Sequence, residues 1–402
     1  MRVLTLNTGS SSLKYRLSEP DKGVILADGL VERIGASEAS IEHTAGGKRI
    51  VCRVKAPNHK AAFNIMLSYL THPEFGAVEE LGQIEAVGHR VVHGGDRFFE
   101  SVEIDPDVIQ AIEEFEELAP LHNPINLLGI RIAKEFLPDV PHVAVFDTAF
   151  HQTMPVEAHT YALPIRFYRD HRIRRYGFHG TSHRYVSRRA AQILSTPLAE
   201  LRMITCHLGN GCSLAAIKGG RSIDTSMGFT PLEGLVMGTR SGDIDPSIVF
   251  YLVNRRGYDL ARVEEILNRE SGLLGLSGIS NDMKVLIDHM KHGSEAARLA
   301  VDVFVYRVKK YIGAYAAILG GLDCLVFTAG IGERSPLIRE RICRGLEHLG
   351  IEIDAKLNQE CVSRESIISP PHSRVKVVVI PTDEEAVIAE ETYNVVKERC
   401  RG

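Results

Sequence analysis

The sequence lacks the short motifs that mark several common enzyme folds. No G-x-x-x-x-G-K-[ST] segment occurs, which excludes a P-loop nucleotide site, and no G-x-G-x-x-G follows an apolar strand, which argues against a dinucleotide fold. HExxH is absent as well. His179 and His183 have the i,i+4 spacing of a helical metal pair, but no glutamate lies between them to act as a metalloprotease base, so the pair does not predict that type of site.

Disulfide frameworks, basic faces and membrane spans are also missing. The seven cysteines are odd in number and form no CxxC pair, which indicates reduced thiols of a cytoplasmic protein. A net charge of −4 gives no basic face for nucleic acid or an anionic membrane. The longest apolar stretch, residues 311–329, is interrupted by two glycines and Asp323, and it predicts a helix end followed by a strand. The N-terminal apolar run is too short for a signal peptide, because it stops at Asn7.

The residues that are present predict a two-domain α/β protein. A chain of 402 residues is long for one domain, and 44% apolar content is enough for sizeable cores. Strands at the N-terminus are followed by alternating helices and strands. Helices are predicted to begin at Asp105-Pro106 and Asn123-Pro124, where an N-cap residue precedes proline. Residues 142–146 and 375–380 read as strands that are buried on both faces.

The pattern of the N-terminal segment restarts near residue 202. Residues 7–13 (Asn-Thr-Gly-Ser-Ser-Ser-Leu) and 208–214 (Leu-Gly-Asn-Gly-Cys-Ser-Leu) are both small-residue turns that enter a strand at Ser-Leu. A duplicated domain with a phosphate-binding turn in each half would produce this pattern. A coincidence between two similar turns is the alternative.

Three glycine-rich turns each follow a short apolar strand. They cover residues 7–12, 207–213 and 329–335. Such turns can direct several backbone N–H groups at a phosphate, although a single glycine turn is usually only a turn. Three of them without a Walker A motif favour nucleotide binding by another architecture.

Four titratable side chains lie inside otherwise apolar or tight segments, namely Arg90, Asp147, His179 and Arg240. Taken singly, each is compatible with a structural ion pair. As a set they match phosphoryl transfer, in which the barrier falls through positioning and through cations near the equatorial oxygens. Arginine suits this task because its planar fork binds phosphate or carboxylate through two hydrogen bonds.

An acidic segment, Thr382-Asp-Glu-Glu385, follows the last predicted strand. Thr382 and Glu385 match a capping box, which is a structural role. Glu384 is then left at the carboxyl edge of the strand, where open α/β sheets bind ligands. A carboxylate there can help to hold Mg²⁺, which needs few protein ligands beside phosphates, and the structural alternative is a favourable interaction with the helix dipole.

Together these segments resemble the acetate kinase family. The resemblance rests on residues 6–14, 118–124, 145–151, 175–183, 207–211, 224–234, 237–246, 329–333 and 381–385. It extends from residue 3 to about residue 390, and several segments contain rare residues in a fixed order.

The resemblance implies a fold shared with actin, Hsp70 ATPase domains and sugar kinases, in which two duplicated α/β domains enclose ATP in an interdomain cleft. We place the domains at residues 1–150, completed by a C-terminal helix at about 385–402, and at residues 151–384. The resemblance also implies a cytoplasmic homodimer whose small-molecule partners are acetate and ATP, with neither nucleic acid nor membrane as a partner. Mg²⁺ is the implied metal, and Mn²⁺ can substitute for it.

The implied activity is reversible, Mg²⁺-dependent transfer of the γ-phosphoryl group of ATP to acetate, giving acetyl phosphate and ADP by direct in-line transfer. Carried over by position, the catalytic residues are Arg90, His122, Asp147, His179 and Arg240, and the metal ligands are Asn7 and Glu384. The acetate site comprises Arg90, Val92, Leu121, Phe178 and Pro231. The ATP site comprises Lys14, His207, Leu208, Gly209, Asn210, Gly211, Asp282, Met283, Lys284, Gly330, Ile331, Gly332, Glu333 and Arg334.

Four positions depart from the family's pattern, namely Cys212, Ile125, Lys284 and Arg334. The last two stand where arginine and asparagine are usual, and they bear on nucleotide contact and on the choice of phosphoryl donor. None of the four is a predicted catalytic residue, so the predicted reaction class is unaffected.

Alternatives to the acetate reaction remain at this point. A carboxylate at pH 7 is already a nucleophile, so we predict that Asp147 positions Arg90, Arg240 or Mg²⁺ and does not act as a general base. One methylene in an apolar pocket is worth only about 1–3 kcal/mol, so a propionate- or butyrate-type kinase is one alternative. An actin-like ATPase, which would not need the paired arginines, and a catalytically silent binding protein are the others.

Overall fold

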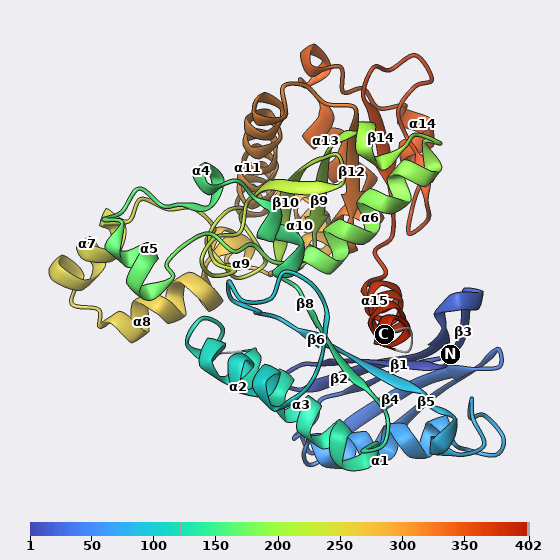
Figure 1. The fold of residues 1–402 in the computed structure, drawn as a ribbon. Helices are drawn as coiled ribbons and strands as arrows, with labels where there is room; N and C mark the ends of the chain where they lie inside the picture. The colour runs from blue at the N-terminus through green and yellow to red at the C-terminus, as the bar shows by residue number, and fades with distance from the viewer. Residues whose placement is uncertain (121, 400–402) are drawn as a thin grey trace. The chain divides into compact units, whose positions relative to one another are not determined.

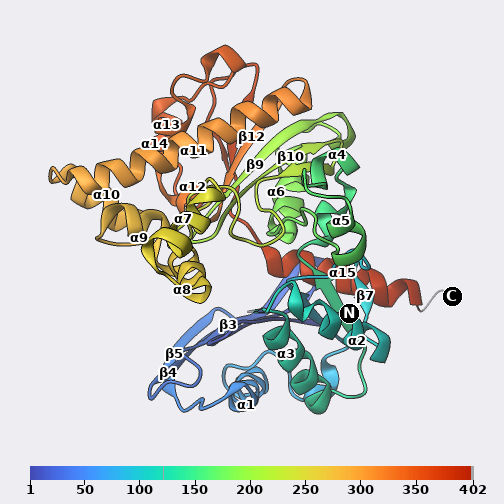
Figure 2. The same cartoon turned by 90° about the vertical axis from the view of Figure 1, so that its left-hand side faces the viewer.

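The computed structural model describes residues 1–120 and 122–399. The chain forms two compact units, Met1–Phe150 with Asp383–Gly402 (unit 1) and His151–Thr382 (unit 2). Figures 1 and 2 show the elements of each unit. Within the described ranges, no helix is both long and apolar enough to cross a membrane. Leu121, one of the residues predicted for the acetate site, lies outside the described residues.

Unit 1 is built on an eight-stranded sheet with the order β5-β4-β3-β2-β1-β6-β8-β7. Its strands are β1 (Val3–Thr8), β2 (Ser12–Glu19), β3 (Val24–Glu32), β4 (Ala39–Ala45), β5 (Lys48–Val54), β6 (Ala86–Val91), β7 (Val102–Glu103) and β8 (His142–Phe146). Its helices are α1 (His59–Leu70), α2 (Pro106–Glu114), α3 (Asn123–Phe136) and α15 (Glu384–Arg399). The strands β1, β6 and β8 run parallel, so their carboxyl ends meet at one edge.

The central strands of the unit 1 sheet are covered by helices on both faces. Leu4 and Leu6 belong to a core with α1 and α3, whereas Val3 belongs to a core with α15. Successive side chains of a strand point to opposite faces, so these two cores lie on opposite sides of β1. The C-terminal helix α15 thereby packs against β1, β6 and β8, as Figure 1 shows.

Unit 2 contains a six-stranded sheet with the order β11-β10-β9-β12-β14-β13. Its strands are β9 (Arg202–Leu208), β10 (Cys212–Lys218), β11 (Arg221–Thr225), β12 (Cys324–Thr328), β13 (Ser366–Ile367) and β14 (Lys376–Val379). Its helices are α4 (Val156–His159), α5 (Arg166–His171), α6 (Gly180–Ile193), α7 (Ser247–Arg256), α8 (Leu260–Glu265), α9 (Gly272–Ser277), α10 (Met283–Lys291), α11 (Glu295–Leu319), α12 (Ala329–Arg334), α13 (Pro336–Cys343) and α14 (Ala355–Glu360). The long helix α11 packs against β9 and β10 (Figure 2), and α6 packs against β9 and β12.

The two sheets repeat one topology. In unit 1 the order β3-β2-β1-β6-β8 combines an antiparallel meander with two parallel strands, and β11-β10-β9-β12-β14 does the same in unit 2. A glycine N–H closes the first turn of each meander, from Gly9 N to Ser12 O at 2.8 Å in unit 1 and, in a turn one residue shorter, from Gly209 N to Gly211 O at 3.1 Å in unit 2. The predicted α/β class is confirmed, and the repeated pairing order favours duplication over coincidence.

One of the two predicted helix caps is wrong. Asp105 caps α2 as predicted, since its Oδ1 accepts a hydrogen bond from Val108 N at 2.8 Å. Asn123 does not cap α3, because it is the first residue of that helix and His122 takes the cap position. The fully buried Asn123 side chain instead binds the backbone of His93, at 3.1 Å to N and 3.0 Å to O. The Asn123 side chain therefore bonds to a residue that is distant in the sequence and does not cap its own helix.

The predicted capping box of α15 is also wrong. Asp383 caps this helix, because its Oδ1 accepts a hydrogen bond from Ala386 N at 3.0 Å. Thr382 Oγ1 donates to Ser182 Oγ at 2.8 Å, and Glu385 pairs with Lys14 Nζ at 2.7 Å. Both side chains are held by partners far away in the sequence, which local pattern reasoning does not reveal.

Two buried histidines connect β6 and β8 in unit 1. His89 Nε2 lies 2.9 Å from His142 Nδ1, and His142 Nε2 lies 2.9 Å from Leu137 O. The carbonyl can only accept, so His142 carries its proton on Nε2 and accepts a hydrogen from His89 on Nδ1. Burial lowers the pKa of His142 to about 4 and the pKa of His89 well below its usual value. The pair therefore fits the fold only in its neutral form.

We expect acid to destabilise the fold through this pair. An unfolded histidine binds a proton near its ordinary pKa of 6.5, whereas folded His142 does so only near pH 4. The free energy of unfolding is therefore unaffected by this residue above pH 6.5, and it falls as the pH is lowered from 6.5 towards 4. For His142 alone, the free energy of unfolding falls by about 3 kcal/mol over this range. Urea denaturation between neutral and acidic pH measures the loss, and His142→Gln, which cannot be charged, should reduce its pH dependence. An unchanged pH dependence in the variant would contradict the assignment.

Candidate active site

The predicted site residues form a separate set in each unit. Unit 1 holds Asn7, Lys14, Arg90, Val92, His122, Asp147 and Glu384. Unit 2 holds Phe178, His179, His207, Leu208, Gly209, Asn210, Gly211, Pro231, Arg240, Asp282, Met283, Lys284, Gly330, Ile331, Gly332, Glu333 and Arg334.

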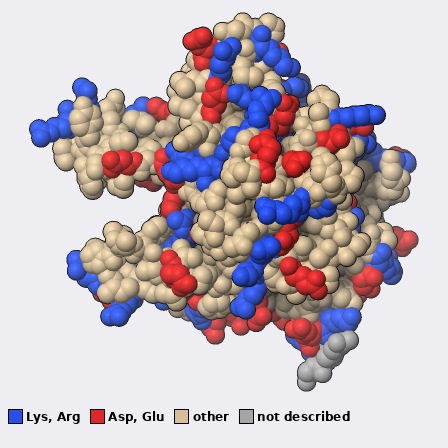
Figure 3. Space-filling model, turned by 90° about the horizontal axis from the view of Figure 1, so that it is seen from above, with Lys and Arg blue, Asp and Glu red and all other residues tan. Residues whose placement is uncertain are grey.

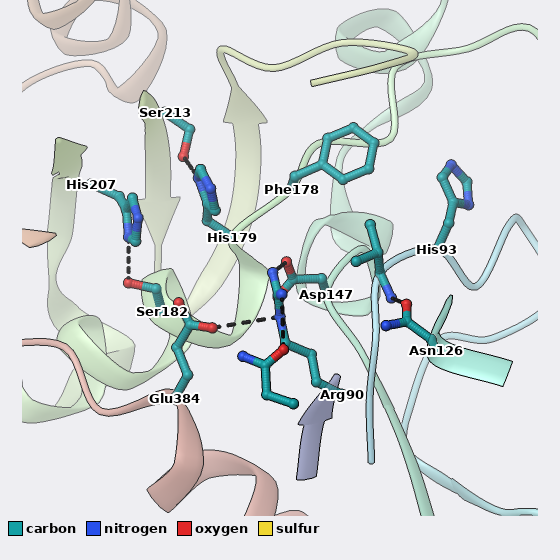
Figure 4. Close-up of polar contacts among 12 residues, drawn as sticks. Arg90, His93, Asn126, Asp147, Phe178, His179, Ser182, His207, Ser213 and Glu384 are labelled. Carbon is teal, nitrogen blue, oxygen red and sulfur yellow. Dashed lines mark hydrogen bonds and ion pairs between the residues drawn. The ribbon is translucent and has the colours of Figure 1, made fainter. Parts of the chain in front are cut away.

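Arg90 is the centre of the set in unit 1. It lies on β6, and its Nη2 donates to Asp147 Oδ2 at 2.7 Å (Figure 4). Its Nη1 donates to Asn7 Oδ1 at 3.4 Å, and its Nε lies 3.5 Å from Glu384 Oε2. Asn7 lies near the end of β1 and Asp147 directly follows β8, so the three adjacent parallel strands bring these side chains to one edge. The structure thus joins four of the predicted residues in one cluster.

Carboxyl groups crowd the arginine in this cluster. Burial raises the pKa of Glu384 to about 7, Arg90 opposes this shift, and Asp147 and Glu385 add to it. A buried carboxyl group that ionises reluctantly would gain from a further cation. Carboxylate and amide oxygens are the hard ligands that Mg²⁺ takes, so Glu384 and Asn7 fit a magnesium ion. Among the described residues no group of three or more His, Cys, Asp or Glu could hold a metal, so such an ion would take its other ligands from phosphate and water.

The three acidic residues that begin α15 each pair with a different cation of the sheet. The pairs are Asp383–Arg16 at 2.6 Å, Glu384–Arg90 at 3.5 Å and Glu385–Lys14 at 2.7 Å. Lys14, predicted for the ATP site, is therefore held by a carboxylate on its own unit. Sequence reasoning missed Arg16 and Asp383, although three consecutive acids at a helix start were a signal that cations lie opposite. These contacts fix the start of α15 and with it the position of Glu384.

His179 is the centre of the set in unit 2. It is the N-cap of α6 and has a left-handed backbone with φ 57°. Its Nδ1 lies 2.9 Å from Ser213 Oγ (Figure 4). Its ring stacks on His207, with centroids 4.1 Å apart, and His207 Nδ1 lies 2.8 Å from Ser182 Oγ. A non-glycine residue in this backbone region persists only where its surroundings hold it, and such residues concentrate at functional sites.

Arg240 differs from Arg90 in its partners. Its Nη1 donates to Pro231 O at 3.1 Å and contacts Met237 Sδ at 3.5 Å. In the described part of the chain it forms no ion pair with a carboxylate. Burial lowers its pKa, but a guanidinium group stays charged in proteins. Arg240 is thus a half-buried cation whose charge no acid balances, which makes it a natural partner for an anionic ligand.

His179 and Arg240 converge on the glycine turn after β9. A Cβ atom placed on Gly211 would lie 3.4 Å from His179 Nε2 and 3.7 Å from Arg240 Nη1. The missing side chain therefore leaves room beside a ring nitrogen, a guanidinium group and bare backbone. Asn210 is held next to them, because its carbonyl oxygen accepts from Gly238 N at 2.9 Å. This arrangement can bind an anion such as a phosphoryl group.

The glycine-rich segment after β12 is not the turn that was predicted. Residues Ala329–Arg334 form the short helix α12, which starts with a left-handed Ala329 at φ 60°. The fully buried Arg339 holds this segment, since its Nη1 donates to Gly332 O at 2.8 Å and Glu333 O at 3.1 Å. Sequence reasoning missed Arg339, because a single arginine on a helix carries no sign that it is buried.

The remaining predicted residues have mixed environments. Val92 and Phe178 are buried, each in its own unit, while Pro231 holds Arg240 through its carbonyl oxygen. Asp282 is the N-cap of α10, because its Oδ1 accepts from Lys284 N at 2.8 Å, and the Lys284 side chain is exposed. Asp282 therefore has a structural role as the cap of α10.

Comparison with known proteins places the whole chain in one family. A model described as the acetokinase family matches residues 2–390. The acetate kinase of Thermotoga maritima is 52% identical over 399 residues, and that of Thermoanaerobacter pseudethanolicus is 54% identical over 399 residues, with 99% of each chain covered in both cases. The crystal structure of Porphyromonas gingivalis acetate kinase has a TM-score of 0.93 at 48% identity and covers 98% of this chain and 99% of that chain. A propionate kinase from Francisella tularensis has a TM-score of 0.91 at 43% identity, with 98% and 99% covered. This chain belongs to the acetokinase family.

Proposed function

We propose that this protein is an acetate kinase, which reversibly transfers the γ-phosphoryl group of ATP to acetate and gives acetyl phosphate and ADP. The observation that carries the proposal is Arg240, a half-buried cation without a carboxylate partner that lies beside His179 and the bare backbone of Gly211. Phosphoryl transfer proceeds with little covalent chemistry from the protein, so fixed cations and donors supply most of the catalysis. The arrangement of these residues therefore favours kinase activity.

The acceptor needs no general base, because acetate is ionised at neutral pH. The 1% exposed Asp147 instead fixes Arg90 through a bond of 2.7 Å. A guanidinium group has five N–H donors, so Arg90 keeps capacity for an oxygen of acetate or of the transferring group. In this role Asp147 is a positioning residue.

Asn7 and Glu384 would hold Mg²⁺, with Mn²⁺ as a substitute. When bound, the metal ion supplies positive charge to the phosphate oxygens of ATP. The proposed contacts of ATP include Lys14, the residues of the glycine turn after β9 and the residues of α12. Lys284 and Arg334 are exposed, so they can influence the choice of phosphoryl donor without disturbing the core.

Trapping of acyl phosphate as its hydroxamate tests the proposal. The protein is incubated with ATP, Mg²⁺ and hydroxylamine, and with acetate, propionate or butyrate in turn. Hydroxamate should form with the highest kcat/KM for acetate. Formation from no acid, with ATP hydrolysis persisting, would reject the kinase assignment and favour an actin-like ATPase.

Propionate is the second candidate acceptor, since a propionate kinase is among the similar structures. We expect Val92→Ala to raise kcat/KM for propionate relative to acetate by about 10-fold, because a pocket discriminates one methylene by only about 1–3 kcal/mol. Steady-state kinetics with both acids measure the ratio. The buried Val87 lies on β6, the strand that Val92 directly follows, and it offers a control, as Val87→Ala should leave the ratio unchanged. A ratio that also stays constant in Val92→Ala would remove Val92 from the acetate site.

The protein is proposed to act as a cytoplasmic homodimer. Helices α7 and α8 expose large apolar side chains, with Phe250 65% and Leu260 68% exposed. Basic and acidic side chains are interspersed on the face shown in Figure 3, which does not resemble a nucleic-acid surface. Light scattering should give twice the chain mass of 44.4 kDa for the native protein, and the single mass for Phe250→Asp combined with Leu260→Asp. Leu299→Asp on α11, where Leu299 is 54% exposed, is the control that should stay dimeric. A double variant that keeps the native mass would place the interface elsewhere.

A further inference from the structure

Two histidines one helical turn apart in unit 2 share a single serine. His179 is the N-cap of α6 and His183 lies in the first turn of that helix, where His183 N donates to His179 O at 2.9 Å. His179 Nδ1 lies 2.9 Å from Ser213 Oγ, and His183 Nε2 lies 2.8 Å from the same oxygen. The other ring nitrogen of His183, Nδ1, lies 2.7 Å from Thr205 Oγ1. Four side chains therefore form one hydrogen-bonded chain from β9 to the proposed site.

Thr205 determines the direction of this chain. Its side chain is fully buried, and in the described structure His183 Nδ1 is the hydrogen-bond partner of its hydroxyl group. A hydroxyl group that only accepted from His183 would leave its own hydrogen buried without an acceptor, which costs about 1–3 kcal/mol. Thr205 therefore donates, and His183 Nδ1 accepts.

The remaining bonds follow from the chemistry of each group. A neutral imidazole has one donor and one acceptor nitrogen, so His183 donates from Nε2 to Ser213 Oγ. Ser213 has one hydroxyl hydrogen, which then goes to His179 Nδ1. His179 accepts on Nδ1 and carries its own proton on Nε2.

Burial keeps His183 neutral, as this assignment requires. Its side chain is 0% exposed, and burial lowers its pKa well below the usual value, with His151 and His207 adding to the shift. A group that does not take up a second proton cannot relay one. The chain thus fixes the position of a proton and does not transfer it.

We propose that Thr205, His183 and Ser213 are positioning residues that hold His179 in its Nε2–H tautomer. The edge of His179 that faces Gly211 is the one formed by Cε1 and Nε2, at 3.3 and 3.4 Å from a Cβ placed there. With the proton on Nε2, this edge donates to an anion, whereas the other tautomer would present a lone pair to it. The consequence for catalysis rests on the proposed kinase function, but the tautomer itself does not.

Nitrogen-15 NMR of histidine-labelled full-length protein tests the tautomer without turnover. The signals of His179 are identified by their loss in His179→Asn. In the unmodified protein, Nδ1 should give a pyridine-type and Nε2 a pyrrole-type signal. A pyrrole-type signal for Nδ1 would overturn the proposal, whatever the outcome of the kinase assay.

Variants of Thr205 test whether the chain sets the tautomer. Thr205→Val keeps the shape but removes the hydroxyl group, so the His179 signals should move towards the other tautomer or towards a mixture. Thr205→Ser keeps the donor and is the matched control, which should retain the native signals. Native His179 signals in Thr205→Val would overturn the role of Thr205 and with it the proposed direction.

Kinetics connect the tautomer to catalysis. We expect kcat to fall about 10-fold in Thr205→Val and about 100-fold in Ser213→Ala, with KM for ATP and acetate nearly unchanged, since a donor aimed at the transition state acts on kcat. Thr205→Ser should restore kcat. Equal loss of kcat in Thr205→Val and Thr205→Ser would show a packing effect and contradict the proposal. An unmodified protein that shows the Nε2–H tautomer but forms no acyl phosphate would instead reject the kinase function alone.

Discussion

Replacement of Arg240 by methionine should lower kcat by about 10³- to 10⁵-fold, the effect of removing an arginine that stabilises the transition state of phosphoryl transfer. Methionine keeps most of the apolar stem, so the loss reports on the charge. Arg240 has no carboxylate partner among the described residues, so its removal leaves no buried acid without a counter-ion. Stability should therefore change far less than activity, which thermal unfolding can verify. Arg240→Lys should recover only a small part of kcat, because an ammonium group cannot form two parallel bonds to phosphate or carboxylate.

The control for this experiment is Arg221→Met. Arg221 is an exposed arginine on β11 of the same unit, and its removal should leave kcat unchanged. If Arg240→Met retained kcat within about 10-fold of the native value, a transition-state role for Arg240 would be excluded, since that role is worth at least about 10³.

Replacement of Asp147 by asparagine should lower both kcat and stability. Asp147 is 1% exposed and bonds Arg90 at 2.7 Å, and breaking a buried ion pair by removing one partner costs about 3–5 kcal/mol. We expect kcat to fall about 10²- to 10³-fold, because Arg90 loses its fixed position. Stability is measured by urea denaturation and kcat by hydroxamate formation.

A double-mutant cycle decides whether Asp147 acts through Arg90. If it does, Arg90→Met combined with Asp147→Asn should have the kcat of Arg90→Met alone, because the positioned group is already absent. Losses that multiply would show that Asp147 contributes to catalysis independently. Glu103→Gln, which breaks the exposed pair with Arg399, is the matched control and should change stability by less than about 1 kcal/mol.

Much of the fold was predictable from local patterns in the sequence. The Ser-Leu turns after β1 and β9 predicted related strand pairs, and the structure extends the likeness to the pairing order of both sheets. Buried strands such as β8 follow from continuous apolar runs, because strands covered on both faces have no polar side. Helix caps were less predictable. Asn123 and Thr382 have the right chemistry for caps, but His93 and Ser182 bind them in the folded chain.

The members of the candidate site were easier to predict than their connections. Arg90, Asp147 and Arg240 are conspicuous because charge is costly inside apolar or tight segments. Which acid meets which cation depends on tertiary structure, as in the pair of Arg16 and Asp383, which lie 367 residues apart. Sequence spacing alone cannot give such partners.

The two histidines at the start of α6 show the same limit of sequence-based prediction. The i,i+4 spacing of His179 and His183 was visible in the sequence, but its meaning was not. Ser213, from the strand after the glycine turn, bridges the two rings, and only the paired strands β9 and β10 bring it there. The pair therefore has a structural explanation that does not require a metal.

Phosphorus NMR of the protein with ATP, Mg²⁺ and acetate is the most direct test of the central claim, because every phosphorus-containing product is seen at once. Transfer of the γ-phosphoryl group to acetate predicts an acyl-phosphate resonance that grows with ADP in equal amounts and disappears when acetate is left out. ADP with inorganic phosphate alone, formed at the same rate with or without acetate, would contradict the claim and identify the protein as an ATPase.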